Sequence, residues 1–449
     1  MTTSIHDDGA APRRRRAGTR ATALASATTM VVLAGLLLGA PAANAARDTP
    51  DDVGGGGVDA PAAELCAPFA GIDAVVATTA TSVTLAGPVG DQTSVTYDVG
   101  GVVQTTTSGP VTFQVGPGRS FVRATIDSSG GSDAVDFSVY PDGGRISGAN
   151  RYETSVEVGV DTNYGACADT VFIANGESFP DALSATPLVV SNAFGELLLS
   201  QRDSLTQTVQ EEIAFSGASN VVLLGGTAAL SPALCDQMPE EIVSCTRISG
   251  PDRYATSLAL AEALFAQQGG TTTQQAFIVS GERFPDAVSV AGLAAFLGIP
   301  VVLVPGSAAT LPTATAAWLA EHVTDGVTIV GGTASVSAGI EAQLQAQYGA
   351  DDASRISGAN RYETSAALAQ ASQVFFGGAS YALLASGERF PDALTGGVLA
   401  GSSGMPLLLT APTCLPAPIA QRIDDLEPAG VLAIGGTAAV SDAALSQVC

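Results

Sequence analysis

The chain has 449 residues, and its 43 Asp and Glu outnumber its 18 basic residues, all of them Arg, so its formal net charge is −25 at pH 7. This balance argues against nucleic acid as a partner, because binding to phosphates rests on clustered cations. Charged residues make up 14% of the chain, against about 25% in ordinary globular domains. We therefore expect a largely neutral surface.

The first 45 residues are typical of an export signal. Arg residues at 13–16 and 20 precede an apolar stretch over residues 24–38, and Ala-Asn-Ala at 43–45 has the small-x-small pattern of a cleavage site. We predict a signal peptide over residues 1–45, with an uncleaved anchor as the alternative. Cleavage removes five Arg and two Asp, which leaves 13 Arg, 41 acidic residues and a net charge of −28. No second apolar run reaches the about 20 residues of a bilayer span, so the secreted chain should have none.

Two different segments follow. Residues 46–65 contain four consecutive Gly and are predicted to be a flexible lead. Residues 66–141 carry short runs in which Val and Thr alternate, broken by Gly, Pro and Asp. This spacing predicts a small antiparallel β-sandwich of immunoglobulin-like type.

Three phrases then recur in a fixed order. Arg-Ile-Ser-Gly-x-x-Arg-Tyr-x-Thr-Ser starts at Arg145, Arg247 and Arg355, and it is followed each time by Gly-Glu-x-Phe-Pro-Asp-Ala and then by Gly-Gly-Thr-Ala. The starts are 102 and 108 residues apart, which is too long for a solenoid unit and indicates a triplicated domain. We place module 1 at residues 142–246, module 2 at 247–354 and module 3 at 355–449.

Each module alternates short apolar runs with helical periods. In module 1 we expect strands over residues 170–174, 196–199 and 220–224, the first being a continuous apolar run typical of a strand covered on both faces. Helices are expected over 153–161, from the Phe-Pro-Asp phrase to about 190, over 206–215 and over 228–238, with Thr154 or Ser155 beginning the first. This order predicts three α/β modules, each a three-layer α/β/α sandwich with a mostly parallel sheet.

Six Cys follow the export signal, an even number in an oxidising compartment. The sequence allows 15 pairings. The short intervening loop favours Cys235 with Cys245, and shared membership of module 3 favours Cys414 with Cys449. Cys66 with Cys167 is what remains.

Eight of the 13 Arg outside the export signal lie in the repeated phrases. A guanidinium grips carboxylate or phosphate with two parallel hydrogen bonds. One interpretation is that Arg and Tyr of the first phrase, with Asp of the second, line three equivalent anion or sugar sites: Arg151, Tyr152, Asp181, Arg253, Tyr254, Asp286, Arg361, Tyr362 and Asp392. The alternative is that each Arg pairs with an Asp of its own or a neighbouring module and cements the module interface. The Phe of each second phrase is expected to be core.

Catalysis and cofactors have little support in the sequence. His322 is the one His outside the export signal, which argues against a zinc site with several His ligands. Neither a nucleophile elbow nor a Gly-rich phosphate loop is present. Glu177, Glu282 and Glu388 could each face a nearby Asp as a glycosidase pair, but solvated or capping roles are far commoner for such acids. We predict no catalytic residue, no cofactor and no dedicated metal site.

The three phrases, in this order and spacing, resemble the cell wall binding repeat 2 family over residues 145–449. The resemblance implies noncovalent attachment to a secondary polymer of the bacterial cell wall, or another peptidoglycan-associated glycan, by three modules in a pseudo-threefold arrangement. It places the chain at the cell wall or cell surface. A wall-remodelling enzyme of amidase type and a self-assembling surface-layer subunit are the alternatives, and the oligomeric state stays open.

Overall fold

The structure is a computed structural model that describes residues 75–79, 82–88, 92–115, 119–129, 131–140, 144–163, 168–178, 180–192, 195–376 and 381–449. The predicted signal peptide and flexible lead lie outside the described residues, as do Cys66 and Cys167. Among the helices within those ranges, none combines the length and the hydropathy needed to cross a bilayer.

The segment before the repeats forms two antiparallel sheets. Strands β1 (Val75–Thr79), β2 (Ser82–Leu85) and β5 (Val111–Gln114) make one sheet. The second has the order β4-β3-β6-β7, from β4 (Val102–Thr106), β3 (Gln92–Val99), β6 (Ser120–Ser128) and β7 (Gly131–Val139). Tyr97 and Phe113 join the sheets with ring centroids 6.4 Å apart. The predicted antiparallel β-domain is confirmed, and its immunoglobulin-like type stays a prediction.

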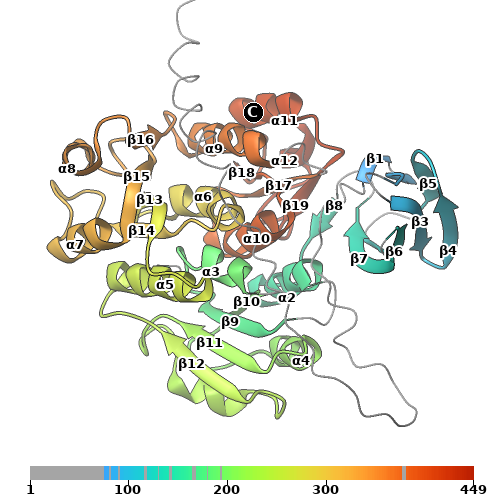
Figure 1. The fold of residues 1–449 in the computed structure, drawn as a ribbon, viewed down its shortest axis with the longest axis horizontal. Coiled ribbons are helices and arrows are strands. Elements are labelled where there is room, and N and C mark those ends of the chain that lie inside the picture. Colours follow the sequence, from blue (N-terminus) through green and yellow to red (C-terminus); the bar gives the residue numbers. More distant parts are fainter. Residues whose placement is uncertain are drawn as a thin grey trace, which may run out of the picture. The chain divides into compact units, whose positions relative to one another are not determined.

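Three four-stranded parallel sheets follow, one for each module (Figure 1). Their orders are β10-β9-β11-β12, β14-β13-β15-β16 and β18-β17-β19-β8. The first three strands of each sheet run as follows: β10 (Glu196–Ser200), β9 (Thr170–Asn175), β11 (Asn220–Leu224); β14 (Val301–Val304), β13 (Thr273–Ser280), β15 (Val323–Val330); β18 (Leu407–Thr410), β17 (Tyr381–Ser386), β19 (Gly430–Ile434). Every residue of β9 and of β17 is buried, as the continuous apolar runs predict. The α/β modules with parallel sheets are therefore confirmed.

The fourth strand of each sheet comes from the next repeat. β12 (Ser244–Ile248) and β16 (Ala353–Ile356) carry the Arg-Ile-Ser phrases of modules 2 and 3, yet they pair with β11 and β15 of the preceding modules. β8 (Gly144–Ile146), from the start of module 1, pairs with β19 of module 3. Each module therefore receives its fourth strand from another repeat, and the three strand exchanges form a closed cycle. The predicted module boundaries 246/247 and 354/355 fall inside β12 and β16.

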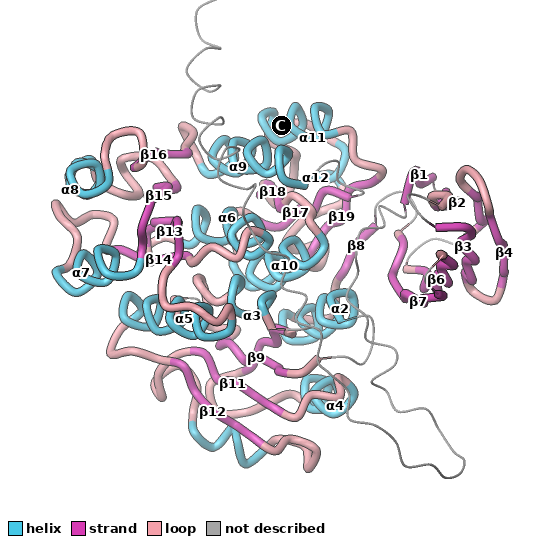
Figure 2. The backbone as a smooth tube through the Cα atoms, viewed as in Figure 1, coloured by secondary structure: helices cyan, strands magenta, loops and turns pink. Residues whose placement is uncertain are grey.

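Helices cover both faces of these sheets. The first of each repeat are α2 (Arg151–Asn163), α5 (Arg253–Gln267) and α9 (Arg361–Phe376); the second are α3 (Thr186–Ser191), α6 (Phe284–Phe296) and α10 (Phe390–Ser403). The outer helices are α4 (Gln207–Phe215), α7 (Thr313–His322) and α11 (Ala417–Leu426), and the last of each repeat are the 3₁₀ helix η3 (Pro232–Gln237), α8 (Ala338–Tyr348) and α12 (Ala443–Ser446). Figure 2 shows α3, α6 and α10 in the space between the three sheets.

Three expectations for the helices of module 1 are wrong. The first helix begins at Arg151, not near Thr154, because the side chain of Asn150 accepts hydrogen bonds from the backbone N–H groups of Tyr152 and Glu153. The second begins only at Thr186, because Pro187 fits a first helical turn but not a helix interior. The segment expected to be a helix over 228–238 is a short 3₁₀ helix over Pro232–Gln237.

The central helices α6 and α10 pack closely because glycines face small residues. A Cβ atom added to Gly292 or to Gly401 would lie 2.6 Å from the Cβ of Ala400 or of Ala295, respectively. Real Cβ atoms do not approach so closely, so these positions exclude larger side chains. Modules 2 and 3 therefore contact each other through closely packed helix backbones.

Two predicted disulfides are present, Cys235–Cys245 and Cys414–Cys449. The first joins η3 to β12, so it holds the exchanged strand of module 2 against module 1. The second fixes the end of the chain to the loop after β18.

We expect loss of the longer disulfide loop to cost more stability. The bridges span 35 and 10 residues, and in the chain-entropy account of crosslinks these loops correspond to about 4 and about 3 kcal/mol. Cys414→Ala with Cys449→Ala should therefore lower the free energy of unfolding more than Cys235→Ala with Cys245→Ala. Urea unfolding of both double variants measures the difference, and the reverse order would show that strand attachment outweighs loop closure.

A pair of buried carboxyl groups distinguishes module 1. Glu196 of β10 is fully buried, and a Cβ on Gly159 would overlap its carboxyl group. Counting along the matched strands, modules 2 and 3 have Pro300 and Pro406 in its place, with Ala261 and Ala369 in place of Gly159. Glu212 of α4 shares a hydrogen bond with Glu196, and burial raises the pKa of Glu212 to about 7, with the negative charge of Glu157 contributing in the same direction.

This pair predicts that stability falls as pH rises through about 7. A carboxyl group with a folded-state pKa above its unfolded value near 4.5 binds its proton more tightly in the folded state. Its contribution is therefore complete below pH 4.5 and is lost as pH rises through 7. Melting temperatures of the parent and of Glu212→Gln between pH 5 and 8 test this. The variant should show the weaker pH dependence, and two parallel curves would contradict the assignment.

Candidate functional site

The repeated phrases meet where the central strands end. β9, β13 and β17 end at Asn175, Ser280 and Ser386, and the Gly-Glu-x-Phe-Pro-Asp phrase follows each of them directly. The carboxyl ends of parallel strands are where open α/β sheets bind ligands. The first turns of α2, α5 and α9, which carry the Arg-Tyr pairs, lie over the same ends.

Each Arg of an Arg-Tyr pair is held by one backbone carbonyl. Nη1 of Arg253 donates to the carbonyl oxygen of Gly281 at 2.6 Å, and Arg151 and Arg361 donate in the same way to Gly176 and Gly387. These glycines are required, because a Cβ at any of them would lie 2.7 to 2.8 Å from the ring of the partner Tyr. The phrases therefore fix the position of each guanidinium at its base.

The three Asp residues each face an Arg of the following module. Asp181 of module 1 accepts a hydrogen bond from Thr256 of module 2 and is attracted by Arg253. The positive charge of Arg361 of module 3 acts on Asp286 of module 2. Arg151 of module 1 acts on Asp392 of module 3. The residues of each predicted site thus come from two neighbouring modules, in cyclic order, and meet at a junction between them.

Those Asp side chains are packed beneath the Gly-Gly turns. A Cβ at the first Gly of each turn would lie 2.2 to 2.5 Å from a carboxylate oxygen of Asp181, Asp286 or Asp392, and the φ of these glycines is near +102°. Both the close approach and the positive φ require Gly. Burial raises the pKa of all three carboxyl groups, that of Asp392 to about 6, while the facing Arg acts in the opposite direction.

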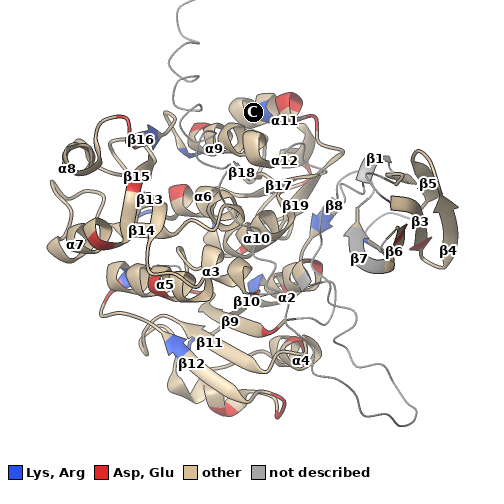
Figure 3. Ribbon diagram, viewed as in Figure 1, with Lys and Arg blue, Asp and Glu red and all other residues tan. Residues whose placement is uncertain are grey.

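The Arg residues of the first phrase divide into two sets. Arg145, Arg247 and Arg355, on the exchanged strands, donate to the carbonyl oxygens of Gly435, Gly225 and Gly331 at 2.5 to 2.6 Å. Figure 3 shows them as blue segments on β8, β12 and β16. Arg355 also forms an ion pair with Glu341 at 2.9 Å, and Arg145 with Asp442 at 3.0 Å. This set holds the exchanged strand to the Gly-Gly turn of the preceding module.

Arg151, Arg253 and Arg361 have no such partner. Among the residues that the structure describes, no carboxylate oxygen lies within 4.0 Å of these three guanidinium groups. A guanidinium has five N–H donors, and the hydrogen bond to glycine uses only one of them. Arg151 and Arg361 are exposed and Arg253 is half-buried. Each of these Arg residues therefore attracts the Asp across its junction at a distance, without a direct ion pair.

The ring of each Tyr packs against the Gly that binds the Arg of the same pair. Tyr152 is buried, whereas Tyr254 and Tyr362 are half-buried. Burial raises the pKa of all three phenols, and the nearby Glu177, Glu282 and Glu388 contribute in the same direction.

Those three Glu residues have local contacts. Glu177 has a hydrogen bond with the phenol of Tyr152, and Glu282 accepts hydrogen bonds from the backbone N–H and side chain of Ser307. Glu388 lies close enough to Tyr362 to raise the pKa of that phenol.

Two groups of residues with contacts at the strand ends were not predicted as site residues from the sequence. Ser155, Ser257 and Ser365 accept hydrogen bonds from the backbone N–H groups of Leu199, Leu303 and Leu409, and so anchor the Arg-Tyr helices to the neighbouring strands. Their presence in the repeated phrase was the available signal.

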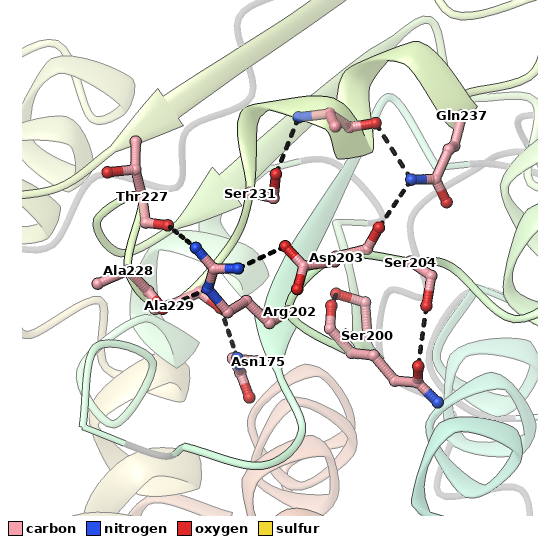
Figure 4. Close-up of polar contacts among 12 residues, drawn as sticks. Asn175, Ser200, Arg202, Asp203, Ser204, Thr227, Ala228, Ala229, Ser231 and Gln237 are labelled. Carbon is pink, nitrogen blue, oxygen red and sulfur yellow. Dashed lines mark hydrogen bonds and ion pairs between the residues drawn. The ribbon is translucent and has the colours of Figure 1, made fainter.

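The second group is a network in module 1. Arg202 pairs with Asp203 at 2.6 Å and donates to the carbonyl oxygens of Ala228 and Thr227 (Figure 4). Asn175 donates to Ala229 next to it. Arg202 lies outside the repeated phrases, so no repetition marked it. Within the described ranges, no group of three or more His, Cys, Asp or Glu could hold a metal ion.

Comparison with known proteins agrees with this architecture. The family model for cell wall binding domain 2 (CWB2) matches residues 145–234, 247–341 and 355–445. Cwp6 from Clostridium difficile has a similar fold, with a TM-score of 0.64 and 20% identity over 81% of this chain and 64% of its own. Cwp8 from the same organism has a TM-score of 0.59 and 24% identity over 72% of this chain and 57% of its own.

Two curated proteins from Bacillus subtilis (strain 168) are similar in sequence. N-acetylmuramoyl-L-alanine amidase LytC is 29% identical over 304 residues, which is 68% of this chain and 57% of that protein. Amidase enhancer is 28% identical over 297 residues, 66% of this chain and 39% of that protein. This chain thus matches about half the length of these relatives or less. Because the family model covers more than half of the sequence in three copies, as the repeated phrases predicted, the chain belongs to the cell wall binding domain 2 family.

Proposed function

We propose that residues 145–449 attach this protein noncovalently to the bacterial cell wall by binding an anionic secondary wall polymer at the three module junctions. The main observation behind the proposal is that the guanidinium groups of Arg151, Arg253 and Arg361 have unused hydrogen-bond donors. In a chain of net charge −25, three equivalent guanidinium groups have no carboxylate in contact among the described residues. Phosphate or carboxylate groups of a polymer would fill their free donors.

The charge of the whole protein opposes an anionic polymer at long range. Binding must therefore rely on short contacts, which salt weakens when the charges are exposed. Burial of Asp181, Asp286 and Asp392 favours their neutral form.

Three linked sites also explain the use of three modules. Each junction takes its Asp from one module and its Arg from the next, so a single module would lack a complete site. A polymer with repeated anionic groups that engages one junction meets the others at high effective concentration. Moderate affinity at each site is then sufficient for lasting attachment at the cell surface.

Two alternative functions can be distinguished from wall attachment by experiment. The likeness to LytC, an amidase by name, raises a wall-remodelling activity for this chain. However, the 304 matched residues are close to the length of the repeat region, and we assign no catalytic role to its acidic side chains. Release of dye from labelled peptidoglycan by the full chain would revive this alternative. Ordered assembly without walls would favour a surface-layer subunit.

The full chain should sediment with isolated walls of its own bacterium. Walls stripped of secondary polymers with hydrofluoric acid should retain much less of it, because the proposed ligand is then absent. Raising the NaCl concentration should release the protein from untreated walls. The measurement is the sedimented fraction at each salt concentration, and equal binding to stripped and untreated walls would rule out the secondary polymer.

The two sets of Arg residues provide a matched comparison. Arg151→Ala, Arg253→Ala and Arg361→Ala together should reduce wall binding at least about a hundredfold, since each removes a charge-assisted contact, and should leave the melting temperature nearly unchanged. Arg145→Ala, Arg247→Ala and Arg355→Ala together should lower the melting temperature, because they release the exchanged strands. Sedimentation and thermal unfolding of both triple variants distinguish the roles. If the first set melts as early as the second, the interface role is correct.

A further inference from the structure

The central helices begin with two aromatic rings in contact. Phe284 is the first residue of α6 and Phe390 the first of α10. Their ring centroids are 6.3 Å apart with an interplanar angle of 64°, an edge-to-face pair. Both side chains are half-buried, and Phe284 packs against the main hydrophobic core. The pair thus lies at the end of the helix packing, on the side where the Arg-Tyr phrases meet. The third Phe for which a core role was expected, Phe179, lies outside the described residues.

An Arg residue precedes each of these rings. Arg283 and Arg389 are exposed, have extended backbones and make no side-chain hydrogen bond to the helix that follows. Like the junction Arg residues, they have no carboxylate oxygen within 4.0 Å in the described part of the chain. Their positive charges do act on Asp286 and Asp392, the third residues of the same helices, so they lie close to the junctions.

Packing accounts for the two Phe rings but not for the two Arg residues beside them. An edge-to-face ring pair needs apolar neighbours, and a shell of neutral residues would cover it at lower cost than two guanidinium groups that lack anions. The chain uses cations sparingly, with 18 Lys and Arg in 449 residues. Module 1 shows that the position tolerates a neutral residue, because it has the exposed Ser178 there.

We propose that Phe284, Phe390, Arg283 and Arg389, here called the central patch, form an additional subsite for a sugar ring and an adjacent anionic group of the wall polymer. The proposal rests on the proposed function and adds a fourth contact to it. The aromatic surfaces offer an apolar platform for the C–H faces of a pyranose, and the two guanidinium groups offer planar forks for phosphate or carboxylate. The anionic group would lie toward modules 2 and 3, because module 1 contributes Ser178.

The test uses wall sedimentation of the full chain over a range of NaCl concentrations. Arg283→Ser with Arg389→Ser introduces the residue that module 1 already has. Arg123→Ser with Arg422→Ser is the control, because it removes the same charge from residues outside the candidate site. We expect the first pair to weaken binding at least about tenfold, the effect of a lost charge-assisted hydrogen bond, and to reduce its salt dependence. The control should change binding less than about twofold, because neither Arg lies at a junction.

Two further variants address the sugar contact and the asymmetry. Phe284→Leu with Phe390→Leu should weaken binding without altering its salt dependence, and the melting temperature shows whether the variant is folded. Ser178→Arg should tighten binding in a salt-dependent manner, because it supplies a third guanidinium.

The outcomes separate the two proposals. If the parent chain fails to bind untreated walls, both the proposed function and the proposed role of the central patch are wrong. If the parent binds but the Arg283 and Arg389 variant matches its control, the junction sites stand and the central patch is wrong.

Discussion

The backbone pairing between the last strand of one module and the first strand of the next is the interaction on which the rest of this structure depends. β11 with β12, β15 with β16 and β19 with β8 are parallel ladders, and the last of them joins residues nearly 300 positions apart in the chain. An unpaired strand edge leaves backbone donors and acceptors exposed. Each exchange satisfies one such edge, and because three exchanges return to the start, the repeat region has a defined number of modules.

The exchange also explains why one phrase contains two Arg residues with different roles. The first lies on the exchanged strand and binds the Gly-Gly turn of the module that receives the strand. The second lies six residues later in every repeat, in the first turn of a helix that remains with its own module. Strand and helix therefore stand on opposite sides of a junction. The second Arg faces the Asp of the preceding module, so the residues of the candidate site come together through the same connection that holds the modules together.

Departures from threefold symmetry occur where the junction geometry does not constrain the residue. Glu196, Gly159 and Glu212 form a matched set in module 1, whereas module 2 uses Pro300, Ala261 and Trp318 for the same positions. A larger group on the strand is accommodated by a smaller one on the helix, as close packing requires. In contrast, the Arg, Tyr, Asp and Gly-Gly positions are the same in all three modules, since each is fixed by a contact at the junction.

The sequence alone determined the features that depend on neighbours along the chain. Continuous apolar runs predicted the buried strands β9 and β17, the Phe-Pro-Asp phrase predicted the starts of α6 and α10, and loop length and module membership predicted two disulfides. The repeats predicted the family and the residues of the candidate site. Local signals were insufficient where Pro187 delayed a helix, and where the exchanged strands β8, β12 and β16 are only three to five residues long. Only the tertiary structure decided which module receives each strand, which Arg faces which Asp, and which Arg lacks a carboxylate. These properties depend on contacts between groups such as Arg145 and Gly435, which are separated by 290 residues. Local sequence preferences do not specify which distant strand will complete a sheet.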